Sequence, residues 1–420
     1  MKKLLLVTSL LFINLQAFET PFGIHGFLET RFGKRTQGAT SQNTKTLSEI
    51  RLQLDYSLQK DEYEFTFRSD FLLDDVALSQ KNDFEEGQGW FDPRELNILF
   101  FPSEDIDVKV GRQILTWGTG DMLFINDLFP KDWNSFFIGR NDEYLKAPSD
   151  AIKTSWFHDI ANVDFVYVPR FDSDRWITGD RLSYWNHHSK TISGQNAITP
   201  SIKPNDWFDD SELSLRVHKN IDGKELAFYM YDGFYKSPAG DDPSGKFAIF
   251  PKLRVTGLSI RSNFKKGIAN LEFGLYQSRD DKSGTNPNII NSEYKFLLGY
   301  EQEIARNFTA SVQYYIESMI NYDSYVKNVF LNTRLKDRTR HVTTLRLSKL
   351  LMNQDLRVSM FTYFSPSDDD LYIRPNVSYK LNDQKTIELG ANLFVRKNEH
   401  TFFGQFNSNN NVYVAMRYSF

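Results

Sequence analysis

Arginine recurs once in each of eight segments in which apolar and polar side chains alternate, each time on the more polar side of the alternation. A guanidinium group binds anions through several fixed N–H donors, so a row of such groups on a hydrated surface would attract anions or carboxylate-bearing solutes. The first three segments and the last five become neighbours only if the two ends of the fold meet. The arginines are Arg31, Arg51, Arg68, Arg346, Arg357, Arg374, Arg396 and Arg417.

Acidic residues share the polar side of these segments and define an alternative. If they pair with the arginines, the surface is hydrated without selecting anions. Glu49 and Asp70 would line the same surface as the arginines. The acids available for neutralisation are Glu29, Glu49, Asp55, Glu64, Asp70 and Glu388. The sequence leaves both interpretations open.

Segment 116–150 combines acidic residues with many apolar ones, such as Trp117, Phe124 and Phe137. So many apolar side chains would be unstable on an ordinary surface loop, so we expect the segment to fold inward. Its acids would then face the arginines across a constriction, or the segment would form a packed cap without selectivity. The acids are Asp121, Asp127, Asp132, Asp142 and Glu143.

No motif for catalysis or metal binding stands out in the sequence. The chain has no cysteine, which excludes disulfides, thiolate metal sites and covalent haem attachment. His187 and His188 lie close to Asp180, but adjacent residues on a loop rarely converge on one metal ion. Glycine-rich phosphate loops and nucleophile elbows are lacking too. We expect no enzymatic activity, no cofactor and no metal.

The elements that hold the candidate residues are β-strands, because side chains at alternate positions of a strand face opposite sides. In 47–59, for example, Ile50, Leu52 and Leu54 lie on the face opposite Arg51. We predict about eighteen strands, with sixteen as the alternative. Their ranges are 22–32, 47–59, 62–73, 94–101, 106–115, 151–158, 162–169, 211–219, 224–233, 252–264, 267–278, 293–303, 307–317, 341–350, 355–364, 371–381, 385–396 and 411–420.

The connections alternate in length. Tight turns such as "QKDE", "NIDGK" and "LNDQK" alternate with long polar stretches, and 365–370 is the short exception among the latter. An even number of antiparallel strands with short turns at one end and long loops at the other is typical of a transmembrane β-barrel. In lipid every backbone amide must be paired, and a closed sheet achieves this. A soluble β-sandwich is the alternative.

Residues 1–17 have the pattern of a cleavable export signal, with Lys2 and Lys3 before an apolar run and Ala17 at the expected cleavage site. We expect residues 18–420 to form a single barrel domain. Loss of the two lysines takes the formal net charge from −4 to −6, which does not favour a nucleic-acid partner.

The chain ends in "NVYVAMRYSF", with apolar residues at alternate positions and a terminal phenylalanine. This segment resembles the C-terminal signature of Gram-negative outer-membrane β-barrel proteins. The resemblance implies insertion in the lipid bilayer of the cell outer membrane and an assembly signal at Tyr418 and Phe420 read by the barrel-assembly machinery. A porin-like barrel implies in addition a homotrimer, and a constriction loop between the fifth and sixth strands, where 116–150 lies.

"VGRQILTWG" and "NDLFPKDW" also resemble a short pattern in proteobacterial outer-membrane barrels of unassigned or porin-like role. Arg112 in the first of these stretches would face lipid if its strand ran straight. We therefore expect a bulge or the end of the strand at that position.

These features predict a porin-like outer-membrane channel for diffusion of small hydrophilic solutes, with anionic solutes among the candidates, through an arginine-lined lumen. A non-conducting surface receptor or adhesin is the alternative if 116–150 closes the barrel. An outer-membrane enzyme such as a phospholipase would need a serine and a histidine together on the outer face near the rim. Ser155 and His158 are the nearest candidates, and they fit poorly because they lie on the short-turn side.

Overall fold

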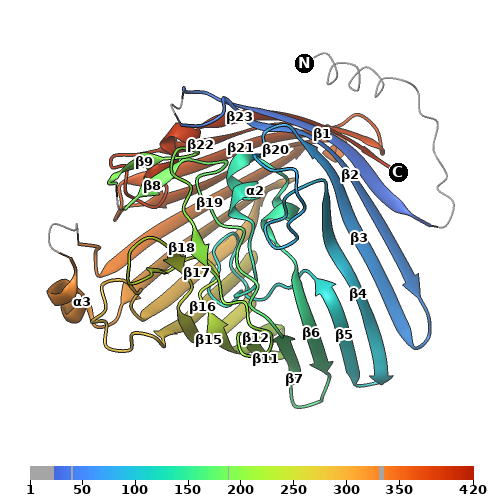
Figure 1. Cartoon of the computed structure of the whole chain (residues 1–420). Coiled ribbons are helices and arrows are strands. Elements are labelled where there is room, and N and C mark those ends of the chain that lie inside the picture. The colour runs from blue at the N-terminus through green and yellow to red at the C-terminus, as the bar shows by residue number, and fades with distance from the viewer. Residues whose placement is uncertain (1–22, 39–40, 188, 331–334) are drawn as a thin grey trace.

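A computed structural model describes residues 23–38, 41–187, 189–330 and 335–420 of the chain, and the predicted export signal lies outside them. Eighteen antiparallel strands form one sheet, which closes where β23 pairs with β1 (Figure 1). The strands are β1 (His25–Arg35), β2 (Lys45–Gln59), β3 (Tyr63–Asp74), β4 (Phe91–Ser103), β5 (Ile106–Gln113), β6 (Ser149–Trp156), β7 (Asn162–Val168), β11 (Glu212–Ile221), β12 (Lys224–Phe234), β15 (Lys252–Phe264), β16 (Gly267–Ser278), β17 (Glu293–Ala305), β18 (Phe308–Met319), β19 (Thr339–Leu351), β20 (Leu356–Ser365), β21 (Asp370–Lys380), β22 (Lys385–Val395) and β23 (Asn411–Ser419).

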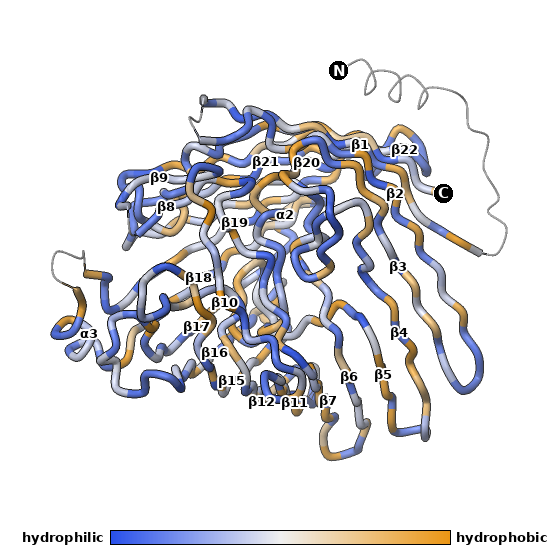
Figure 2. The backbone as a smooth tube through the Cα atoms, in the orientation of Figure 1, coloured by the Kyte–Doolittle hydropathy of each residue, from blue (hydrophilic) through white to orange (hydrophobic). Residues whose placement is uncertain are grey.

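The period-two pattern of the sequence places polar side chains inside and apolar ones outside. On β2, Glu49 and Arg51 are buried within the barrel, whereas Ile50 and Leu52 face outward. Hydrophilic and hydrophobic positions therefore alternate along the strands in Figure 2. The predicted eighteen-stranded antiparallel barrel is confirmed.

Short turns and long loops lie at opposite ends of the barrel, as predicted. The chain end meets β1 at the short-turn end, where the Gly26 N–H donates to the Phe420 carbonyl at 3.1 Å and the Phe420 N–H donates back at 3.0 Å. The 3₁₀ turn η2 (Met352–Gln354) lies at this end too.

The long loops contain short elements that the sequence analysis did not predict. They are α2 (Trp133–Ile138), η1 (Asp142–Leu145), the hairpin β8 (Tyr184–Asn186) and β9 (Thr191–Ser193), the small sheet of β10 (Ser201–Ile202), β13 (Gly240–Asp241) and β14 (Ala248–Ile249), α3 (Tyr322–Asn328) and η3 (Gly404–Asn409). Within the described residues, no helix is long and apolar enough to cross a bilayer.

Arg112 lies one residue before the end of β5, in agreement with the predicted strand end. It alternates with the buried Gln113 and therefore faces outward, where its guanidinium donates to the Pro93 carbonyl at 2.7 Å and pairs with Asp150 at 3.0 Å. It also contacts the carbonyl of Phe84 in the β3–β4 loop. These partners satisfy a charge that would otherwise face lipid.

Candidate functional site

The loop between β5 and β6, residues 114–148, contacts inward-facing residues of strands that are not its neighbours in the barrel. Glu272, a buried inward-facing residue of β16, accepts hydrogen bonds from the Gly120 N–H at 2.7 Å and from the Asn126 side chain at 2.9 Å. Its carboxylate also accepts from the Thr119 N–H and, at 3.2 Å, from the Asn126 N–H. One carboxylate thus holds two separate stretches of the loop.

Two facing glycines leave room for this part of the loop. Gly257 of β15 pairs with Gly274 of β16, and both face inward. A Cβ at Gly257 would lie 1.8 Å from the Asn126 side-chain oxygen, and one at Gly274 would lie 2.7 Å from a methyl group of Ile125. The Tyr276 hydroxyl then donates to the Ile125 carbonyl at 2.5 Å. Strands β15 and β16 are therefore shaped to receive the loop.

The middle of the loop forms helix α2 inside the ring of strands (Figure 1). Asp132 caps its start by accepting from the Ser135 N–H at 2.7 Å, and Gly139 ends it with a φ of 94°. The ring of Phe137 packs against Tyr372 of β21 and Phe394 of β22, with centroids 5.3 and 5.5 Å apart. The apolar residues of 116–150 therefore lie in an aromatic cluster within the barrel.

Three arginines of the predicted row are buried, namely Arg31, Arg51 and Arg374, and the first of them lies on β1. Its guanidinium pairs with Glu29 at 3.1 Å and Glu388 at 2.8 Å, and donates to the Gly139 carbonyl at 2.6 Å. Arg417 of β23 pairs with the same Glu29 at 3.0 Å. Arg31 therefore joins β1 and β22 to the C-terminal end of α2.

Arg51 is the second buried arginine. It pairs with Asp70 of β3, and its guanidinium lies 4.1 Å from the ring centroid of Tyr144 in the β5–β6 loop. Gln53 bridges the same two residues through hydrogen bonds of 2.8 and 3.2 Å. Asp70 and Arg51 are thus enclosed by the loop.

Glu49 is surrounded by cations from two different loops, which sequence reasoning missed. Arg140 donates to it at 2.6 Å, and Arg181 of the β7–β11 loop does so at 3.0 Å. Arg181 also pairs with Asp74 at the end of β3. Both arginines lie in irregular segments, so no periodicity indicated their partners.

Other arginines remain partly exposed to solvent inside the barrel, and Arg346 of β19 is the clearest example. Its Nε and Nη2 atoms contact the two carboxylate oxygens of Asp121 at 2.6 and 2.8 Å. Gln313 of β18 holds the Asp121 backbone through hydrogen bonds of 2.8 and 2.7 Å. This ion pair between an inward-facing strand residue and the β5–β6 loop is therefore partly exposed to solvent.

Two further pairs join the wall to η1 of the loop. Arg374 of β21 pairs with Asp142 at 2.9 Å, and Arg417 pairs with Glu143 at 3.0 Å. Both acidic side chains are strongly exposed, whereas Arg374 is buried against α2. Negative charges of the loop therefore lie beside positive charges of the wall.

The remaining arginines of the row differ from one another. Arg68 of β3 pairs with Asp55 at 2.7 Å and Glu95 at 3.0 Å and is partly exposed. Arg357 of β20 is exposed near the short-turn end and makes no ion pair with any described residue. Arg396 lies just beyond β22 and pairs within its own loop, so it does not join the others.

Asp127 and Asp132 do not contact the arginines of the predicted row. Asp127 pairs with Lys131 at 3.1 Å and with Lys146, both from the same loop. Asp132 caps α2 and contacts Arg175 of the β7–β11 loop at 3.5 Å. These two acids therefore stabilise loop structure.

Burial and neighbouring charges shift the pKa values of the Asp127–Lys131 pair inside the loop. Burial, helped by the nearby charge of Lys146, lowers the pKa of Lys131 to about 8 against the opposing effect of Asp127. Burial alone would raise the pKa of Asp127, but the two lysines more than offset it and hold that pKa below its ordinary value.

The remaining candidate residues do not come together as a catalytic or metal-binding site in the part of the chain that the structure describes. The Ser155 hydroxyl donates to Asp164 at 2.6 Å, and His158 accepts from the Ile160 N–H at 3.1 Å. His188 lies outside the described residues, among which no group of three potential metal ligands comes together.

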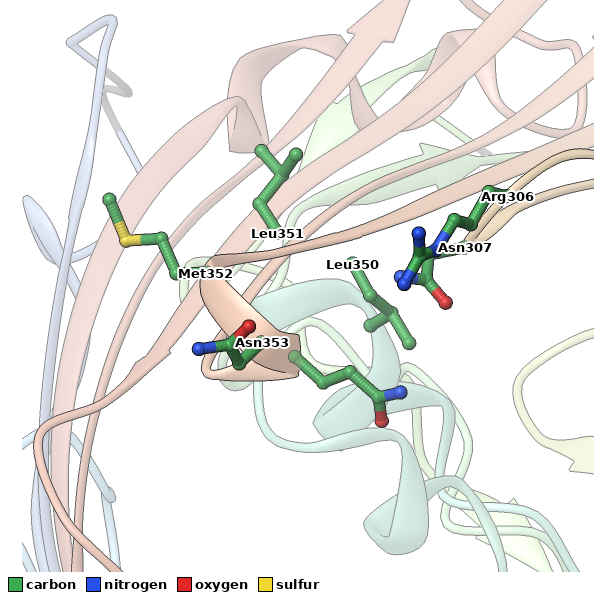
Figure 3. A pocket seen from close by; sticks show the side chains of 7 residues that line it. Arg306, Asn307, Leu350, Leu351, Met352 and Asn353 are labelled. Carbon is green, nitrogen blue, oxygen red and sulfur yellow. The ribbon is translucent and has the colours of Figure 1, made fainter.

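A surface hollow lined by Arg306 and Asn307 and by Leu350 to Gln354 lies on the short-turn rim, away from the loop contacts (Figure 3).

The rings of Tyr418 and Phe420 lie 6.4 Å apart at the end of β23, where that strand joins β1. Their side chains therefore lie at the join between the first and last strands. The predicted role in assembly concerns a partner and stays a prediction.

No family model and no curated protein sequence matches this chain. Among solved structures it is similar to OccK11 (OpdR) of Pseudomonas aeruginosa, with a TM-score of 0.52 and 8% identity over 94% of this chain and 95% of the other. It is also similar to OccD3 (OpdP) of the same organism, with a TM-score of 0.50 and 11% identity over 95% and 91%. A triple mutant of the Rhodopseudomonas blastica porin gives 0.41 and 10% over 95% and 99%. The predicted resemblance to porin-like outer-membrane barrels is confirmed at the level of the fold.

Proposed function

We propose that this protein is an outer-membrane channel through which small hydrophilic solutes diffuse. The observation that carries the proposal is a closed barrel with an apolar outer face and solvent-exposed charges on its inner face, among them Arg357, Glu301 and Glu303. Exposed charges inside a closed sheet require water there, and a hydrated barrel interior spanning a bilayer is a path for polar solutes.

The β5–β6 loop is proposed to narrow this path. Its contacts with Glu272, Arg346 and Arg374 cross the barrel interior, so the solute path must pass beside the loop. Small anionic solutes are proposed to be favoured weakly, at the exposed arginines Arg68, Arg346 and Arg357. The preference is weak because Asp121 and other acids offset much of the positive charge.

Insertion of the purified mature protein into a planar lipid bilayer tests this proposal. We expect stepwise conductance that is blocked by polar polymers above a size limit. Absence of steps from protein that is folded, as judged by its β circular dichroism, would contradict conduction.

A non-conducting receptor or adhesin is the second candidate, and the aromatic cluster around Phe137 favours it, because tightly packed rings exclude water. The variant Glu272→Ala separates the two functions, since it weakens the loop anchor. If wild-type protein is silent and the variant conducts, the loop closes the barrel in the native state.

Export through residues 1–17, outer-membrane location, recognition by the barrel-assembly machinery and a homotrimer are proposed together with the channel. Cell fractionation tests the location, and light scattering of the detergent-solubilised protein tests the trimer. The channel is proposed to have no enzymatic activity, and Ser155, which contacts Asp164, gives a phospholipase no support.

A further inference from the structure

A cluster of charged side chains lies on the outer face of the barrel at the long-loop ends of β12, β15 and β16. Asp232 and Arg254 are paired across β12 and β15. Their chain neighbours Tyr231 and Val255 are buried on the inside, so Asp232 and Arg254 face outward. Arg279 follows directly after β16 and reaches the same carboxylate.

Asp232 holds the two guanidinium groups side by side. Arg254 contacts its Oδ2 through Nε at 2.7 Å and Nη2 at 2.5 Å, and Arg279 contacts its Oδ1 through Nη1 at 2.5 Å. The arginine side chains remain 49% and 39% exposed, and their other N–H groups have no partner among the described residues. Lys252, also outward and exposed, adds a third cation, and Asp280 accepts its backbone N–H at 2.8 Å.

The surface directly below this cluster is apolar. Met230 of β12 and Leu258 of β15 lie further toward the short-turn end than Asp232, Leu213 of β11 lies beside Asp232, and all three are exposed on the same outer face. The charged cluster therefore lies at the upper edge of an apolar band, where the acyl chains of a bilayer end and the headgroups begin. Charged residues at this level can bind headgroups while neighbouring apolar side chains contact the acyl chains.

We propose that Arg254 and Arg279 bind the phosphate group of a membrane lipid at the long-loop surface of the barrel. Two exposed guanidinium groups offer the N–H donors that phosphate oxygens accept in bidentate fashion. Basic clusters beside a membrane bind anionic headgroups for the same reason. The apolar surface below favours a lipid over free phosphate, because it also binds acyl chains. The inference rests on the proposed membrane location and is independent of conduction.

Native mass spectrometry of the mature protein in detergent tests this site with dioleoyl phosphatidic acid and dioleoylglycerol, which share their acyl chains and differ in the phosphate. We expect wild-type protein to bind the phosphorylated lipid about tenfold more tightly than the neutral one. The double variant Arg254→Gln/Arg279→Gln should lose most of this difference. The matched control is Arg261→Gln, which removes one arginine from the inward face of the same strand and should bind as wild type does.

Several results would overturn the inference. One is an unchanged preference for phosphatidic acid in the double variant, and another is an equal loss of that preference in the Arg261 control. A third is competition by inorganic phosphate as strong as by lipid. The last is a change of oligomeric mass in the double variant, which would assign the cluster to a contact between copies. If the double variant does not fold, Asp232→Asn replaces it. This variant frees both arginines from a competing carboxylate, so it should bind phosphatidic acid at least as tightly as wild type, and weaker binding would equally refute the site.

Discussion

Two arginines of one predicted row, Arg51 on β2 and Arg346 on β19, occupy very different surroundings. The Arg51 side chain is 3% exposed and lies between Asp70 and the ring of Tyr144. The Arg346 side chain is 29% exposed and shares its partner Asp121 with water. Both lie on the polar face of an amphipathic strand, so the strands do not cause the difference. The difference arises because the loops cover Arg51 and leave Arg346 open to solvent.

This difference separates arginines that hold the loops from arginines that can meet a solute. Removing one partner of a buried ion pair leaves an uncompensated charge and costs about 3–5 kcal/mol. An exposed pair contributes about 0–1 kcal/mol, but its charges still act on ions nearby. Substitutions in the buried group should therefore change stability, and those in the exposed group should change selectivity.

The largest effect is expected for Glu49→Gln. Glu49 accepts from Arg140 and Arg181, and its loss leaves their buried guanidinium groups with too little negative charge. We expect the free energy of unfolding to fall by about 3–5 kcal/mol, measured by guanidinium denaturation in detergent. The matched control Glu143→Gln, at the exposed pair with Arg417, should cost about 1 kcal/mol or less. Equal losses of unfolding free energy in both variants would contradict the distinction between buried and exposed charged residues.

Glu272→Ala should have the next largest effect, and it concerns the loop more than the barrel. Hydrogen bonds to a carboxylate are stronger than neutral ones, and Glu272 accepts them from Thr119, Gly120 and Asn126, all of which belong to the loop. We expect faster proteolysis within the loop and noisier single-channel currents, with the barrel still folded. Glu301→Ala, an exposed inward-facing acid that makes no such contact, is the control. Identical cleavage of both variants would show that Glu272 does not anchor the loop.

The barrel itself was predictable from the sequence, because each strand carries its own period-two pattern and each turn its own composition. The inward fold of segment 116–150 was likewise expected, because its apolar side chains, such as that of Phe137, would otherwise be exposed to water. The pairing within the site was not predictable. Arg140 and Arg181 converge on Glu49 from loops without periodicity, and only the packed arrangement brings them together.

Arg346→Gln and Asp121→Asn sharpen the comparison by removing opposite charges of one exposed pair. We expect the ratio of chloride to potassium permeability to fall by about twofold in the first variant and to rise by a similar factor in the second. The measurement is the reversal potential in a potassium chloride gradient. Arg68→Gln should shift the ratio in the same direction as Arg346→Gln, because Arg68 is also partly exposed. Unchanged reversal potentials in all three would place the conducting path elsewhere.

The smallest effect is a pH dependence from Lys131, a buried cation of the loop that lies beside Asp127, Lys146 and Asp174 and over the ring of Phe124. Its pKa is about 8 in the folded protein and 10.5 as the reference value for the unfolded chain. Between these values the unfolded state binds more protons, so the penalty that burial of Lys131 imposes on folding shrinks as the pH rises from about 8 to 10.5, by at most about 1.4 kcal/mol per unit, and is constant below about pH 8.

Lys131→Met isolates this contribution, because it keeps a long apolar side chain and removes the titrating group. Denaturation of wild type and variant at pH 7 and pH 9 should give a difference in unfolding free energy that shifts in favour of wild type at the higher pH. Lys397→Met, at an exposed ion pair with Asp369, should show no such shift. A constant difference for Lys131→Met would mean that the lysine stays protonated and that Asp127 outweighs burial, which would place this loop cation with the buried arginines, which stay charged beside their carboxylates.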